Sequence, residues 1–166
     1  RNTCAQGVGT LFTARATILS EDEGIEMSVN KSSSGNSLQS VCLAADAILD
    51  QCSAYIDRVS DEQFVQESRV VPGGTIGKHV RHTLDHFRCA ITTCCTEPID
   101  YDHRCRGGCV ESDRDEAKKE VATLRSLVGD LSEAELAETV TTRVMLAGDG
   151  HTADLESTRA REIFFA

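Results

Sequence analysis

A helical period of apolar residues between Leu38 and Val59 constrains the fold of this chain more than any other feature. Over this stretch apolar residues return every three or four positions, which is the spacing that keeps side chains on one face of an α-helix. The residues on this face are Leu38, Val41, Cys42, Ala45, Ile48, Leu49, Cys52, Tyr55, Ile56 and Val59. A face this long needs other helices to cover it, so the pattern predicts a helical bundle.

Two more helices and a hairpin follow the first period. Apolar positions at helical spacing predict a helix over residues 75–95 and another over 113–130, and Asp113 is the predicted cap of the second. Residues 139–157 predict two paired strands, because they are rich in β-branched side chains and contain the turn dipeptide Asp-Gly. Ser157 or Thr158 then caps a fourth helix. The fold class is therefore mainly α, with a small β-hairpin.

The ends of the chain differ in character from its middle. Residues 1–36 hold no sustained period, and their last six residues are rich in serine, so we interpret them as an irregular extension and linker. Residues 37–166 form the predicted helical domain. The chain begins at Arg1 without a methionine and stops inside the apolar run Ile163–Ala166, so we expect the last helix to be truncated and the domain to be incomplete.

Charge and composition exclude some partners. The chain carries 17 Lys+Arg and 27 Asp+Glu, a formal net charge of −10, so we expect no nucleic-acid binding because phosphates would repel it. No apolar run is long enough to predict a membrane span. Eight cysteines without a visible secretory signal favour a reducing compartment, which predicts a cytoplasmic protein. Residues 1–20 contain two arginines and no acidic residue, so organelle import is the alternative.

Three histidines share the predicted helix 75–95. His79, His82 and His86 are spaced by three and four, which places them on one face beside the apolar arc. Imidazole is a common metal ligand at neutral pH, so this stripe is a candidate metal site in a crevice between helices. The alternative is a half-exposed polar flank that binds nothing.

The residues around this stripe resemble a known family. The segment 74–87, GTIGKHVRHTLDHF, is similar to the second-helix signature of the DinB/YfiT-like superfamily, and the loop 99–106, IDYDHRCR, is similar to a loop of bacterial DinB-like proteins. The resemblance covers about residues 37–166. It implies an up-down four-helix bundle in which His82 is one of three ligands of a divalent metal, zinc or nickel. The other two ligands would lie beyond residue 166, so this chain would not bind the metal fully.

The same resemblance implies a function class. Some family members are metal-dependent hydrolases or thiol S-transferases that act on small molecules, while many have no known activity, so whether this chain is an enzyme stays open. We expect the His82 imidazole to point into the centre of the bundle, with His86 as the candidate accessory base. Tyr101, Arg104 and Arg106 are candidates for binding an anionic substrate, and the alternative is an internal ion-pair network.

Two other function classes fit the sequence. The first is a non-catalytic, stress-associated bundle that forms a homodimer through helix faces. The second is an interaction module stapled by zinc through a loop that is rich in cysteine and contains His103. The cysteines of this second hypothesis are Cys89, Cys94, Cys95, Cys105 and Cys109.

Overall fold

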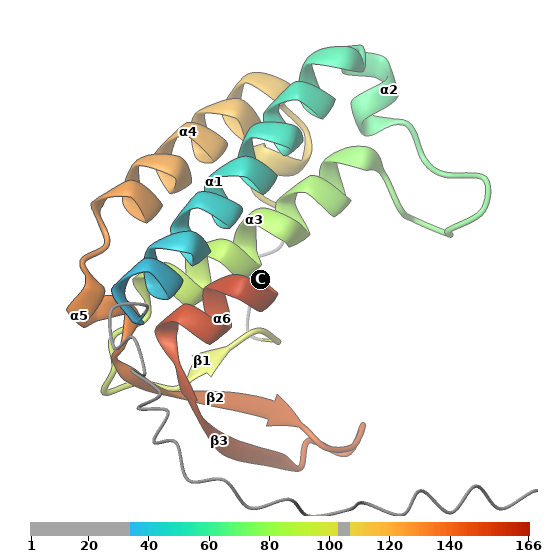
Figure 1. The fold of residues 1–166 in the computed structure, drawn as a ribbon. Helices are drawn as coiled ribbons and strands as arrows, with labels where there is room; N and C mark the ends of the chain where they lie inside the picture. Colours follow the sequence, from blue (N-terminus) through green and yellow to red (C-terminus); the bar gives the residue numbers. More distant parts are fainter. Residues whose placement is uncertain (1–33, 103–106) are drawn as a thin grey trace, which may run out of the picture. The chain divides into compact units, whose positions relative to one another are not determined.

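Helices dominate the computed structural model, which describes residues 34–102 and 107–166 (Figure 1). The long elements are α1 (Ser34–Arg58), α3 (Ile76–Thr92) and α4 (Arg114–Asp130), and the shorter α6 (Arg159–Phe165) follows the hairpin. The connections contain α2 (Asp61–Val65), the 3₁₀ turn η1 (Cys109–Glu111) and α5 (Glu133–Leu136). The mainly helical class is confirmed. The described residues belong to one compact unit, Lys31–Ala166.

The core lies between α1, α3, α4 and α6. Both α1 and α3 pack against α4 and against α6, so these four helices surround one apolar interior. Fully buried side chains on the predicted helical faces include Leu49, Ile56, Leu84, Phe87, Val121, Leu124 and Val128. Other fully buried side chains lie outside these faces: Phe64, Ile99, Leu136, Val140 and Ile163. Each such side chain contributes about 1.5–3 kcal/mol through removal of apolar surface from water. Ile48 and Tyr55 lie on the predicted face of α1 but are 47% and 48% exposed, because they border a groove between α1 and α3.

The direction of the chain changes the predicted topology. Arg81 of α3 pairs with Glu111, just before α4, and Arg88, further along α3, pairs with Glu120 of α4. Residue numbers therefore increase in the same direction along both helices, which means that α3 and α4 are parallel. In contrast, Arg125 of α4 contacts Asp46 of α1, near the opposite end of that helix from the Arg114–Ile56 contact. The prediction of strict up-down alternation is therefore wrong at this connection. The physical reason is that η1, which leads into α4, packs beside the start of α3, so α4 sets out from the same end of the bundle as α3.

A three-stranded sheet lies across one end of the helices (Figure 1). The predicted hairpin is confirmed: β2 (Thr139–Met145) and β3 (Thr152–Thr158) pair antiparallel. A third strand that was not predicted, β1 (Ile99–Asp100), pairs parallel with β2 and buries Ile99. Two residues are too few for a strand period, so only the neighbouring strand makes this segment extended.

Polar side chains define where the long helices begin. Thr75 accepts a hydrogen bond from the Lys78 amide at 3.0 Å at the start of α3. Asp113 accepts the amides of Asp115 and Glu116 at the start of α4, as predicted, and Thr158 caps α6. Each cap satisfies amides that have no partner within the helix, which is worth about 1 kcal/mol. Among the described helices, none combines the length and the apolar composition that a bilayer span requires.

Candidate functional site

A chain of polar contacts joins α3, β3, α6 and the residue that follows β1. Its members are His82, His86, Tyr101, Ser157 and Glu162, which we name the His82–Glu162 cluster. The helical spacing of α3 brings the two histidines onto successive turns. The parallel pairing of β1 with β2 places Tyr101 beside this face, and the Thr158 cap starts α6 so that Glu162 reaches it.

The two imidazoles contact each other edge to face. Their ring centroids are 4.6 Å apart with an interplanar angle of 77°, and the His86 ring stacks on Tyr101 at 4.7 Å and 9°. His82 itself is exposed, so the expectation that its ring points into the centre of the bundle is wrong. The reason is helical geometry: position 82 lies about 200° around α3 from the buried Val80, almost on the opposite side of the helix.

Glu162 holds the buried part of the cluster together. The Tyr101 hydroxyl donates to Glu162 Oε2 at 3.0 Å, and the buried Ser157 hydroxyl donates to Oε1 at 2.6 Å. Burial raises the pKa of Tyr101 above its ordinary value, and the nearby Glu162 carboxylate raises it further. The phenol therefore stays protonated and acts as a donor at neutral pH. Its hydroxyl already has an internal partner, so substrate binding by Tyr101 stays a prediction.

The other two residues predicted to bind an anionic substrate are arginines of the loop after β1. Arg104 and Arg106 lie outside the described residues, as do His103 and Cys105.

The described part of the cluster does not complete a metal centre. Within residues 34–102 and 107–166, no three histidine, cysteine, aspartate or glutamate side chains converge so that they could hold a metal ion. His82 and His86 supply two imidazoles from one helix, whereas catalytic zinc sites take at least three protein ligands. The three-ligand centre that the resemblance implies therefore needs groups other than those described, and no metal-dependent step follows from this geometry.

The described cysteines of the zinc-staple hypothesis lie in different elements. Cys89 lies in the last turn of α3 and Cys94 and Cys95 follow it, whereas Cys109 begins η1. Within the described residues, no three of these cysteines converge with one another or with other metal-binding side chains. The described cysteines therefore do not form one four-sulfur site.

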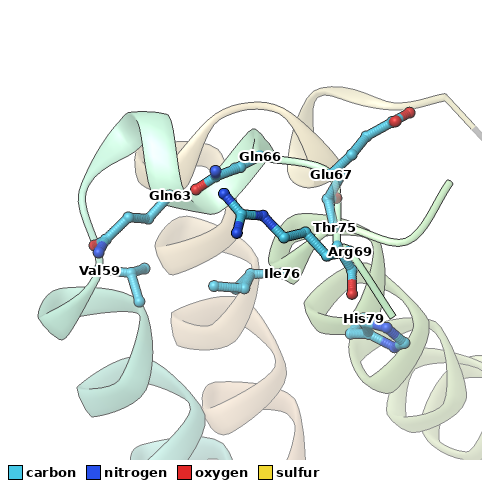
Figure 2. A pocket seen from close by; sticks show the side chains of 9 residues that line it. Val59, Gln63, Gln66, Glu67, Arg69, Thr75, Ile76 and His79 are labelled. Atoms are coloured by element: carbon cyan, nitrogen blue, oxygen red, sulfur yellow. The ribbon is translucent and has the colours of Figure 1, made fainter. Parts of the chain in front are cut away.

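A polar pocket beside the start of α3 was not predicted. It has a volume of about 460 Å³, and Figure 2 shows the Arg69 side chain directed towards Gln66 while Glu67 points away. Ile76 and His79 line both this pocket and the groove between α1 and α3, which measures about 510 Å³. Residues such as Arg69 and Gln66 carry no periodic signal in the sequence, because the pocket arises only where the connection after α2 folds back on α3.

The chain was compared with family models, with curated proteins and with solved structures. None of the three comparisons finds a match. The DinB/YfiT-like resemblance therefore stays a prediction that rests on the residues quoted for it.

Proposed function

We propose that this protein binds a divalent metal, zinc or nickel, with His82 as one ligand, and acts on a small molecule as a hydrolase or thiol S-transferase. The observation that supports this proposal is the exposed His82 imidazole with the His86 ring one helical turn away at 4.6 Å. Two histidines four residues apart on one helix face are an arrangement that chelates transition metals. The reaction class comes from the family resemblance alone.

The environment of the pair supports a functional role for these rings. His86 lies between the exposed His82 and the Tyr101–Glu162 hydrogen bond, so its ring orientation is fixed by contacts on two sides. A ligand that is held in one orientation loses less entropy on binding, which favours affinity. His86 is the candidate accessory base of the proposal because it is the ring nearest to His82. The proposal also requires ligands beyond those that the described residues supply.

Paramagnetic nickel tests the proposed ligand even where binding is weak. We expect Ni²⁺ added to the ¹⁵N-labelled chain to broaden amide signals around His82 selectively. We expect His82→Ala to raise the apparent Kd at least about tenfold, which corresponds to about 1.4 kcal/mol. Zn²⁺ should compete and restore the signals.

A matched control lies on the same helix. His79 is also exposed on α3, so His79→Ala removes an imidazole of similar accessibility and should leave the broadening around His82 unchanged. Equal effects of the two substitutions would refute the assignment to His82. Loss of metal binding in Cys105→Ser alone would favour the zinc-staple hypothesis.

A second candidate is a non-catalytic bundle that pairs with another copy of itself. Large apolar side chains are exposed on α1 and at the end of α6: Leu43, Ile48, Tyr55, Phe164 and Phe165. Of these, Ile48 and Tyr55 share one face of α1, and an exposed apolar face is typical of interaction sites. Sedimentation equilibrium should then show a dimer that Ile48→Ser weakens, whereas Leu155→Ser, an equally exposed change on β3, should not. A monomer at all concentrations would contradict this candidate.

A further inference from the structure

Two adjacent thiols follow the last turn of α3. Cys94 and Cys95 are both exposed and both free, and they lie outside the His82–Glu162 cluster. They occupy a turn in which the Glu97 amide donates to the Cys94 carbonyl at 2.9 Å. The turn therefore presents two sulfur atoms from neighbouring residues to solvent.

Each of the two thiols contacts a different polar partner. Cys94 Sγ lies 3.2 Å from the Thr96 hydroxyl, and this contact together with the Thr96 backbone lowers the pKa of the Cys94 thiol. The Cys95 thiol hydrogen-bonds to the Glu138 carboxylate, which raises the pKa of Cys95. Cys94 is thus the thiol that ionises more readily and reacts first.

A buried arginine fixes the backbone on which the pair sits. Arg159 donates to the carbonyls of Ala90, Ile91 and Thr93 and also to Glu138, the hydrogen-bond partner of Cys95. The residue before Cys94 and the partner of Cys95 are therefore held by one guanidinium. This contact orders the turn before any ligand arrives, which reduces the entropy lost on binding.

A disulfide between Cys94 and Cys95 would be strained. Consecutive Cα atoms lie about 3.8 Å apart across a trans peptide, and disulfides usually need about 4.4–6.8 Å. A closed disulfide between neighbours therefore carries strain and is easily reduced. A larger atom that bonds to both sulfurs forms a wider ring and relieves this constraint.

We propose that Cys94 and Cys95 form a two-sulfur binding site for a soft, thiophilic trivalent centre of the organoarsenical type. Soft thiolates select soft ions over hard ones such as Mg²⁺ and Ca²⁺. Zinc takes four ligands in structural sites, and in the described part of the chain no third protein ligand converges with this pair. A trivalent centre that already carries one organic substituent needs only two sulfurs, which is what this turn offers.

The binding step balances without an oxidant. Each thiol gives up its proton and forms one sulfur–arsenic bond, the arsenic–oxygen bond of the arsenical oxide breaks, and the oxygen leaves with both protons as water. Arsenic remains trivalent and both sulfurs keep their oxidation state. Cys94 attacks first because its thiol ionises more readily than that of Cys95, and Cys95 then closes the ring.

Phenylarsine oxide is the probe for this site. Intact-mass measurement of the native chain should show one phenylarsenic adduct, with the loss of two titratable thiols per adduct. We expect Cys94→Ser and Cys95→Ser each to lower the affinity at least about tenfold, because one remaining sulfur cannot form the ring. Serine at position 95 retains a hydrogen-bond donor for Glu138, so this variant should keep the fold; circular dichroism and thermal melting of both variants check this.

Cys109 provides the control. It is an exposed cysteine in a different element, η1, so Cys109→Ser should leave the adduct and its affinity unchanged. The proposal is overturned if the double variant Cys94→Ser/Cys95→Ser still forms the adduct at native affinity. It is also overturned if Cys109→Ser or Cys105→Ser abolishes the adduct, because the arsenical would then bind in the loop that follows β1.

Discussion

Replacement of Gly77 by alanine should destabilise the protein by about 3 kcal/mol, because no space exists for the added methyl group. A Cβ atom at this position of α3 would lie 2.1 Å from the carbonyl oxygen of Glu111 and 2.7 Å from Cε1 of Phe64. The first contact is with backbone, so no side-chain rotation can relieve it. The start of α3 must move away from η1, and this movement separates Arg81 from Glu111.

Urea denaturation followed by circular dichroism measures this loss. Gly129→Ala is the matched control, since Gly129 lies in helix α4 with open space around its Cβ position. Alanine has a higher helix propensity than glycine, so this variant should gain about 0.5–1 kcal/mol. A Gly77→Ala variant that is as stable as wild type would show that α3 and η1 are not packed as described.

Arg159→Ala should cost a similar free energy, about 3 kcal/mol, because it removes a buried cation with several partners. Arg159 is only 5% exposed and donates to the carbonyls of Ala90, Ile91 and Thr93 as well as to Glu138. These carbonyls end α3 and have no helical partners of their own. Without the Arg159 guanidinium these carbonyls lose their hydrogen-bond donor, and the hydrogen bonds that join α6 to the end of α3 are lost.

A surface arginine tests whether burial is the cause. Arg143 makes two 2.8 Å hydrogen bonds to Asp154 on the exposed hairpin, so Arg143→Ala removes a similar bidentate pair and should cost less than about 1 kcal/mol. Urea denaturation measures the free energy of unfolding of both variants. Equal losses would contradict the view that burial makes Arg159 contribute more than Arg143.

The Arg159 contribution should also depend on pH. Arg159 lowers the pKa of Glu138 below its ordinary value of 4.5. A lowered pKa stabilises the fold above the unfolded-state value and this stability is lost as pH falls through the folded-state value. The difference between wild type and Arg159→Ala should therefore shrink on acidification below about pH 4.5.

The helices of this protein were predictable because local information specifies them. The apolar period between Leu38 and Val59 needs only the 3.6-residue repeat, and the caps at Asp113 and Thr158 act on amides two or three residues away. The hairpin was predictable for the same reason, since its two strands are joined by a short turn. In each case the interacting residues are near neighbours in the chain.

The candidate site was predictable only in part. His82, His86 and Tyr101 could be chosen individually by residue type and spacing, but nothing in the sequence joins Tyr101 to Glu162, which lies 61 positions later. The exposure of His82 was also missed, because the resemblance outweighed its position on the helical wheel, far from Val80. Contacts between distant segments depend on the paths of the connecting loops, and no local sequence pattern predicts these paths.

By itself the sequence determined that this chain forms amphipathic helices and one hairpin, because hydrophobic periodicity and capping act over a few residues. Only the tertiary structure decided that α3 and α4 run parallel, that β1 joins the sheet, and that Arg159 ties the end of α3 to α6. The parallel course of α3 and α4 depends on the packing of η1 beside the start of α3, where Glu111 closely approaches Gly77. A contact of this kind stabilises the fold only after the segments on both sides of it have packed. It therefore produces no periodic pattern in the sequence.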